Sequence, residues 1–261
     1  MGLKLNTRTS ASNCAVISKY NTFGDHTIVV ISETSNRKLQ ARFFVGKTFN
    51  IYIIPSSDKQ IDSWEAYENV VCSKECPHRK DQLGDCYVGS YSVWSVVRKY
   101  RESLAENKNP QTIYDKSNYA VRATAHGDME VLNFEGRMFM YNLLVNASEA
   151  RAYTSGWNTP HMQMFSDICM ASVNDIESAR QAQALGWKTY RVRHNTSTQK
   201  DLREVNCVVL GNGHISEQGR GCFGSCATPC NGKRHNVVSP NHEKLKAMQK
   251  RFDEKLVSTA P

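Results

Sequence analysis

Hydrophobic residues along this chain fall into short runs that turn-forming residues separate. Two runs in the first sixty residues, HTIVVIS (26–32) and TFNIYIIP (48–55), are apolar and β-branched and predict strands. Later runs predict further strands, at NYAVRATA (118–125), ARAYTSGW (150–157), ICMASVND (168–175), KTYRVRHN (188–195) and EVNCVVLGNG (204–213). The segment WEAYENVV (64–71) leads into a loop that we place between a strand and a helix.

Helical patterns alternate with these runs. Residues 90–107 carry Val93, Val97 and Leu104 on one face, and 136–150 and 176–186 predict two more helices, the last ending at Gly186. This alternation indicates βαβ units and a parallel sheet. We therefore expect an α/β fold, a partial parallel (β/α) barrel with fewer strands than the eight of a closed barrel.

The pattern also divides the chain into three parts. We expect an N-terminal β-rich region at residues 1–60 and a partial α/β barrel core at 61–205. A C-terminal cysteine-rich, metal-binding segment follows at 206–261, with a terminal helix after Ser239-Pro240.

Composition narrows the class of protein. The chain has 261 residues, of which 40% are hydrophobic and 22% charged, as in globular proteins. No run of eighteen apolar residues predicts a membrane span, and the first residues lack the apolar core of a signal peptide. We therefore expect a cytoplasmic protein without membrane contact. The net charge of +8 favours a polyanionic partner or an anionic small molecule.

Nine cysteines are the most informative residues, because clustered cysteines in a reducing compartment indicate metal or redox chemistry. Cys72, Cys76 and Cys86 lie in one irregular segment. Three thiolates can bind three irons of a [4Fe–4S] cluster and leave the fourth iron open to substrate. They could also bind zinc with a fourth ligand such as His78 or Cys14.

A second cluster lies in the tail. Four thiolates suffice for a structural zinc site or for a fully ligated second iron–sulfur cluster, and both interpretations stay open. The glycines between them allow a tight loop around a metal. The expected ligands are Cys207, Cys222, Cys226 and Cys230.

The segment RATAHGD (122–128) ends a predicted buried strand. In parallel α/β folds ligands gather at the carboxyl ends of strands. Gly127 would let a ligand approach the backbone, and Asp128 could bind an ammonium or hydroxyl group. The alternative is a simple turn in which Asp128 caps the next helix.

Taken in order, these pieces resemble the radical S-adenosylmethionine superfamily. In that superfamily three cluster cysteines follow the first strand of a partial barrel, with the usual spacing Cys-x3-Cys-x2-Cys. Here Cys72, Cys76 and Cys86 take that place with a longer second gap, and His126-Gly127-Asp128 take the place of the glycine-rich acidic motif. Thr154-Ser155 end the next strand, Ser172 to Asp175 match the ribose position, and LGNG (210–213) matches the adenine position.

The resemblance implies a function and a set of roles. It implies an enzyme that cleaves S-adenosylmethionine reductively, draws on an electron donor, and acts on a small-molecule or nucleic-acid substrate. Asp128 and His126 would be catalytic. The residues that would hold the cofactor are Gly127, Asp128, Thr154, Ser155, Ser172 and Asn174.

The segment CPHRKDQLGDCYV, the HGD strand, the AYTSGW strand and the cysteine-rich tail also resemble a bacteriophage protein family without a known activity. That likeness extends over most of residues 70–245. It implies a phage-encoded protein that works in the cytoplasm of an infected bacterial host.

Two other functions remain open. One is a zinc-containing, transglycosylase-like enzyme acting on nucleic-acid bases, with Asp128 as nucleophile and a structural zinc on Cys222, Cys226, Cys230 and either His235 or His242. The other is a non-enzymatic, zinc-dependent nucleic-acid-binding protein in which both cysteine clusters are structural. The positive net charge suits both.

Overall fold

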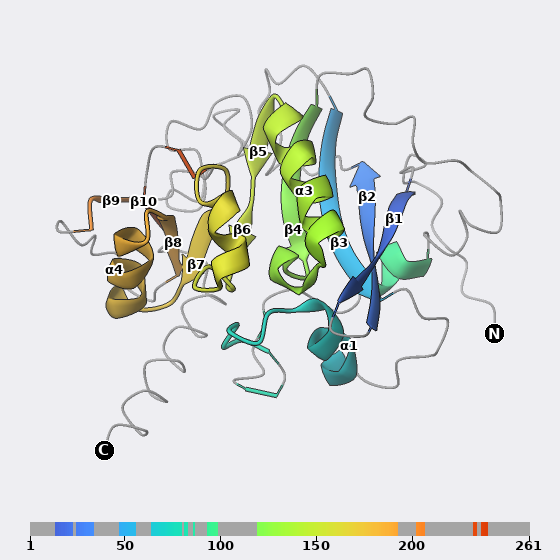
Figure 1. Ribbon diagram of the computed structural model, residues 1–261, viewed down its shortest axis with the longest axis horizontal. Coiled ribbons are helices and arrows are strands. Elements are labelled where there is room, and N and C mark those ends of the chain that lie inside the picture. Colours follow the sequence, from blue (N-terminus) through green and yellow to red (C-terminus); the bar gives the residue numbers. More distant parts are fainter. Residues whose placement is uncertain are drawn as a thin grey trace, which may run out of the picture.

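The computed structural model describes residues 14–22, 25–33, 47–55, 64–79, 81–82, 86, 93–98, 119–192, 202–206, 232–233 and 236–239. Within these residues strands and helices alternate, and the strands form two five-stranded sheets (Figure 1). The predicted α/β class with parallel strands is confirmed.

The first sheet has the strand order β1-β2-β3-β4-β5. Strands β1 to β3 form an antiparallel meander, and β3, β4 and β5 pair in parallel. The predicted runs 26–32 and 48–55 lie within β2 and β3, where buried Val29, Ile51 and Ile53 explain their β-branched composition. The strands are β1 (Cys14–Thr22), β2 (Asp25–Glu33), β3 (Lys47–Pro55), β4 (Tyr119–His126) and β5 (Glu149–Arg151).

The second sheet is parallel throughout and has the order β6-β7-β8-β10-β9. The predicted strands 168–175 and 188–195 coincide with β7 and β8, whereas no pattern had indicated β10. The strands are β6 (Tyr153–Thr154), β7 (Met170–Val173), β8 (Lys188–Val192), β9 (Glu204–Asn206) and β10 (Asn236–Ser239).

One interrupted strand joins the two sheets. The run predicted as a single strand at 150–157 forms β5 and β6, with Ala152 between them. The carbonyl of Ala152 accepts a hydrogen bond from the backbone N–H of Met170 at 3.0 Å, so the segment pairs with β4 on one side and β7 on the other. The parallel strands β3 to β8 therefore follow one another in chain order across both sheets.

A bulge in β4 lies at the same joint. One residue of β3, Ile51, stands opposite three residues of β4, which include Thr124 at a φ of 53°. A β-branched residue at positive φ is strained. The hydroxyl of Thr124 donates to the Tyr153 carbonyl at 2.9 Å, and so a side chain connects β4 to β6 where backbone pairing ends.

The helices begin at residues that cap them. Asn133 accepts from the Gly136 N–H at 2.9 Å to start α3 (Phe134–Asn146), and Asp175 accepts from the Ser178 N–H at 2.7 Å to start α4 (Ile176–Ala184). Gly186, at a φ of +89°, follows α4 as predicted. Figure 1 shows α3 and α4 on the same face of the strands, as right-handed crossovers require.

The segment before the first cysteines differs from the prediction. Residues 64–71 form helix α1 (Trp64–Val71) rather than a strand, because buried Tyr67, Glu68 and Val71 repeat at helical spacing. Residues 93–98 of the predicted helix 90–107 are helical, with Val93, Val96 and Val97 buried. None of the helices among the described residues is long and apolar enough to cross a membrane.

The hydrophobic core lies between the strands and these helices. Each large apolar side chain buried there contributes roughly 1.5–3 kcal/mol relative to exposure. The largest fully buried side chains are Trp187, Tyr67, Phe49, Phe165, Ile51, Ile53, Ile54, Met129 and Leu132.

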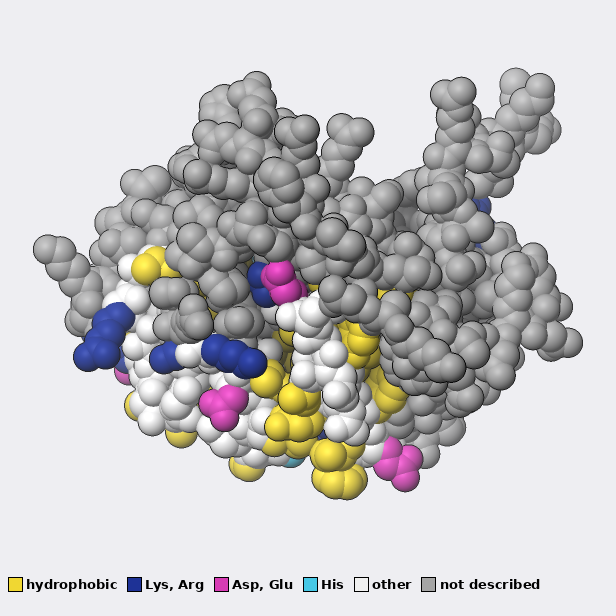
Figure 2. All heavy atoms as spheres, turned by 90° about the horizontal axis from the view of Figure 1, so that it is seen from above, with side chains coloured by type: hydrophobic (Ala, Val, Ile, Leu, Met, Phe, Trp, Pro, Cys, Tyr) yellow, Lys and Arg dark blue, Asp and Glu magenta, His cyan; other side chains and the backbone are white. Residues whose placement is uncertain are grey.

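Figure 2 looks onto the top of the molecule as drawn in Figure 1. Most of the Lys and Arg side chains visible among the described residues lie on the side where α4 and β8 lie. The first cysteine segment lies at the bottom of Figure 1, so it is on the opposite edge of the molecule.

Candidate metal and ligand site

The first three cysteines lie at the carboxyl end of β4. The backbone N–H of Asp128, two residues after β4 ends, donates to the carbonyl of Val71 at 2.7 Å. Val71 is the last residue of α1, and Cys72 follows it directly. This contact therefore places the start of the segment 72–86, which we name the thiol loop, beside the HGD turn.

Backbone and side-chain contacts shape the thiol loop. The N–H of Cys86 donates to the carbonyl of His78 at 3.0 Å, and the N–H of Cys76 donates to the carbonyl of Ser73 at 3.2 Å. The buried guanidinium of Arg79 binds the Asp81 carboxylate through two hydrogen bonds of 3.1 and 2.9 Å. It also donates to the side chain of Asn69 in α1, which fastens this part of the loop to the helix.

The middle of the loop reaches the second sheet. His78 Nε2 lies 2.9 Å from Asn174 Oδ1, across a separation of 96 residues. Asn174 directly follows β7. The thiol loop therefore spans from the end of β4 to the end of β7.

Cys72, Cys76 and Cys86 are half-buried thiols rather than disulfides. Burial raises the pKa of Cys72 well above its ordinary value, and the neighbouring charges of Cys76 and Cys86 raise it further. Burial also raises the pKa of Cys76, although the backbone N–H of His78 and the hydroxyl of Ser155 oppose the shift. The loop thus brings the three thiols close enough to influence one another.

The described thiols are not arranged as a finished metal site. Among the residues that the structure describes, no group of three or more His, Cys, Asp or Glu side chains is placed to hold a metal ion. The expected ligands of the second cluster, Cys207, Cys222, Cys226 and Cys230, and the LGNG segment lie outside the described residues. Gly232, which is described, packs against the backbone of buried Cys169.

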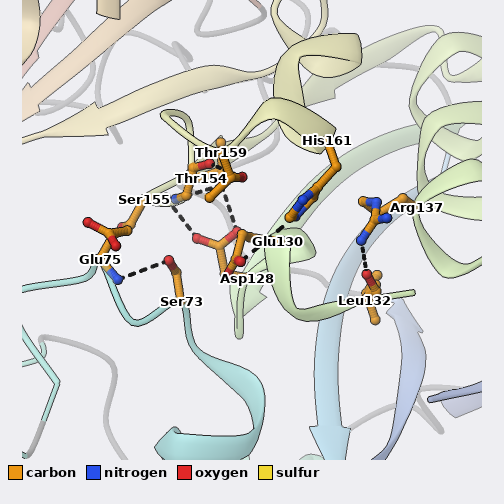
Figure 3. A network of polar contacts seen from close by, with 11 residues as sticks. Ser73, Glu75, Asp128, Glu130, Leu132, Arg137, Thr154, Ser155, Thr159 and His161 are labelled. Carbon is orange, nitrogen blue, oxygen red and sulfur yellow. Dashed lines mark hydrogen bonds and ion pairs between the residues drawn. The ribbon is translucent and has the colours of Figure 1, made fainter. Parts of the chain in front are cut away.

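Asp128 is the centre of a buried hydrogen-bond network (Figure 3). Its carboxylate accepts from the Thr154 hydroxyl at 2.7 Å, the Ser155 N–H at 2.7 Å and the Glu130 N–H at 3.0 Å. It thereby caps the short helix η2 (Met129–Val131) and ties the end of β4 to the end of β6. Burial raises its pKa, while these hydrogen bonds lower it. Three of the roughly four acceptor positions of a carboxylate are thus used inside the protein.

Gly127 is required by packing. Its φ is +81°, and a Cβ there would lie 2.7 Å from Cβ of Ile53 and 3.1 Å from the Val71 carbonyl oxygen. The sequence suggested that Gly127 would let a ligand approach the backbone. In the structure, β3 and α1 approach the backbone at that position instead.

His126 lies in the core beside α1. Its ring packs on that of Tyr67 at a centroid distance of 5.4 Å. Burial lowers its pKa to about 4, so the imidazole is neutral at physiological pH.

Glu130 is a member of the site that sequence reasoning missed. Its carboxyl group is buried, and its Oε1 lies 3.8 Å from Nε2 of the exposed His161 (Figure 3). Burial raises its pKa, the charge of Asp128 raises it further, and the Ser73 hydroxyl opposes the shift. Gly156 leaves room for this side chain, since a Cβ at Gly156 would lie 2.3 Å from Glu130 Cγ. The sequence signal that could have identified it is the second acidic residue of the segment HGDME (126–130).

The structure thus brings together most of the described residues that the sequence singled out. Thr154 and Ser155 contact Asp128, Ser155 also contacts Cys76, and Asn174 contacts His78. Ser172 lies in β7, two residues before Asn174, and is partly exposed.

Comparisons with known proteins find no counterpart for this arrangement: no family model, curated protein or solved structure matches the chain. The site must therefore be interpreted from its own geometry.

Proposed function

We propose that this chain is an iron–sulfur enzyme of the radical S-adenosylmethionine type, with an open cluster bound by Cys72, Cys76 and Cys86. The observation that carries the proposal is the position of the thiol loop across the carboxyl ends of β4 and β7. Parallel α/β folds bind ligands at this edge. The chain order of β3 to β8 suits a partial barrel.

The chemical type of the donor side chains suits such a centre. Three thiols within one loop, near one another and not in disulfides, are the ligands that iron–sulfur clusters take. Coordination deprotonates a thiol, so a bound cation would relieve the mutual repulsion that raises the pKa of Cys72. Binding would draw the three side chains together from their described positions.

Each neighbouring group has a role that follows from its contacts. The Ser155 hydroxyl and the His78 N–H stabilise the thiolate of Cys76 by hydrogen bonding. Asp128 acts indirectly, since its carboxylate holds the turn 154–156 against the end of β4. When bound, the cluster would supply the electron that cleaves S-adenosylmethionine, and the protein would orient the cofactor and substrate.

The carboxyl of Glu130 is better placed than Asp128 for proton transfer. The carboxylate of Asp128 is engaged by three hydrogen bonds, whereas Oε1 of Glu130 lies 3.8 Å from Nε2 of the exposed His161. Glu130 and His161 would therefore hold or release a proton beside the substrate, as a general acid–base pair does.

Metal analysis tests the proposal. Protein purified and reconstituted without oxygen should contain about four irons and four sulfides per cluster bound. Alanine substitution of Cys72, Cys76 and Cys86 together should lower the content by about four irons and four sulfides. Cys169→Ala is the matched control, because that buried thiol lies directly before β7, outside the loop.

Cofactor cleavage is the second readout. Wild-type protein given a strong reductant and S-adenosylmethionine should release methionine and 5′-deoxyadenosine, whereas the triple variant should not. Zinc as the only bound metal would refute the proposal. It would favour the two zinc-dependent alternatives, the transglycosylase-like enzyme and the nucleic-acid-binding protein. An iron content that the triple variant retains in full would also contradict it.

A further inference from the structure

His78 connects three separate parts of the site. Its backbone carbonyl accepts from the Cys86 N–H at 3.0 Å. Its backbone N–H is a hydrogen-bond donor to the Cys76 thiol and lowers that thiol's pKa. Its ring lies 2.9 Å from Asn174 Oδ1. One residue thus contacts two cysteines through its backbone and the second sheet through its side chain.

The ring contact differs from the other anchors of the thiol loop. The Val71–Asp128 hydrogen bond fixes the start of the loop, and Arg79 fixes its middle to α1 through Asn69. Neither of these reaches β7. The Ser155 hydroxyl holds the Cys76 thiol itself at the end of β6, whereas the contact between His78 and Asn174 holds the backbone around residue 78 at the end of β7. Through the backbone bonds of His78, this second contact also bears on the positions of Cys76 and Cys86.

The contact between His78 and Asn174 requires one hydrogen-bond donor and one acceptor. With the amide oxygen of Asn174 facing the ring, Nε2 of His78 carries the proton and donates it. The amide oxygen is thereby engaged with the loop. Asn174 then acts on the metal site through His78, rather than contacting a ribose with that oxygen.

We propose that His78 is the positioning residue of the thiol loop and that Asn174 orients it. This inference rests on the proposed function, since it assigns the device that holds two of the three cluster ligands in place. Groups that orient metal ligands in this way affect metal retention strongly, and their loss typically weakens metal binding by about 10- to 100-fold.

The test measures how fast the reconstituted protein loses iron to a chelator in the absence of oxygen. His78→Phe keeps a ring but removes the donor, and Asn174→Ala removes the acceptor. Each should lose iron about 10-fold faster than wild type. The double variant should be no worse than either single variant, because both remove one interaction.

Conservative variants separate positioning from folding. Asn174→Asp keeps an oxygen facing Nε2 and should restore slow iron loss and the wild-type electron paramagnetic resonance spectrum. Asn146→Ala is the control for an asparagine outside the site, since the Asn146 amide donates to the Asn142 carbonyl near the end of α3.

Each outcome decides between the two proposals. If the wild-type protein binds iron and both single variants retain it at the wild-type rate, the inference about His78 is wrong while the proposed function stands. If His78→Phe loses iron quickly but Asn174→Ala does not, the ring acts without Asn174 and the inference again fails. If the wild-type protein binds no iron, the proposed function fails first and the inference falls with it.

Discussion

Gly127 offers a direct test of how the HGD turn is built. In Gly127→Ala the new Cβ would meet Cβ of Ile53 at 2.7 Å, with backbone oxygens of Ile53 and Val71 at 3.0 and 3.1 Å. The residue also has a φ of +81°, where a side chain costs about 1–2 kcal/mol. Forcing the neighbours apart costs about 1–3 kcal/mol more. Alanine also makes the unfolded chain less flexible than glycine does, which offsets about 0.4–1 kcal/mol of this destabilisation.

The expected net loss is therefore about 2–4 kcal/mol of unfolding free energy. Gly186→Ala is a matched control, because Gly186 also has a positive φ, +89°, but a Cβ there would meet nothing within 4 Å. That variant should lose only about 1 kcal/mol.

Urea unfolding followed by far-ultraviolet circular dichroism measures both losses. The difference between the variants isolates the close approach of β3 and α1 to the turn. Equal losses in Gly127→Ala and Gly186→Ala would refute the reasoning, because the backbone conformation alone would then explain the effect.

Two further predictions concern buried charge. Arg191→Met leaves the Glu204 carboxylate buried without the guanidinium that now binds it at 2.6 Å, and we expect a loss of about 3–5 kcal/mol in urea unfolding; a loss below 1 kcal/mol, as for surface pairs, would contradict this. The pKa of His126 is about 4 in the folded protein against 6.5 ordinarily, so the unfolded state binds more protons between these values. The unfolding free energy should therefore fall by about 2 kcal/mol from pH 7 to pH 5, and His126→Phe should lose that part of the pH dependence.

Strand positions were predictable because the hydrophobic runs are short and β-branched. β2, β3, β4, β7 and β8 all lie where the pattern placed them. The first four supply buried apolar residues to the core, whereas the described buried side chains of β8, Thr189 and Arg191, are polar. Helix α1 was not predicted, although its buried residues repeat at helical spacing, because eight residues are too few for the pattern alone to distinguish a helix from a strand. The break at Ala152 follows from the sharing of one strand between two sheets, which no local pattern records.

The sequence predicted most of the residues of the site, but few of the contacts between them. Strand ends in parallel folds converge, so Asp128, Thr154 and Asn174 could be grouped from the order of strands alone. The cap that Asp128 forms on the next helix was one of the two interpretations that the sequence offered, and it is present at η2. The hydrogen bonds from Thr154 and Ser155 to Asp128 were not predicted, because they depend on which side chains reach across between strands. Glu130 was missed because its burial arises from Gly156, a residue 26 positions away that leaves room for it.

The contact between His78 and Asn174 has a consequence for how the protein folds. It closes a loop of 96 residues and can form only after β7 has joined the sheet. Long-range closure is slow, because the entropy of the chain must be lost before the contact is gained. During that interval the thiols of residues 72–86 are without their final neighbours. We therefore expect the chain to be most sensitive to oxidants while it folds, and a reducing environment to matter more for its synthesis than for its storage.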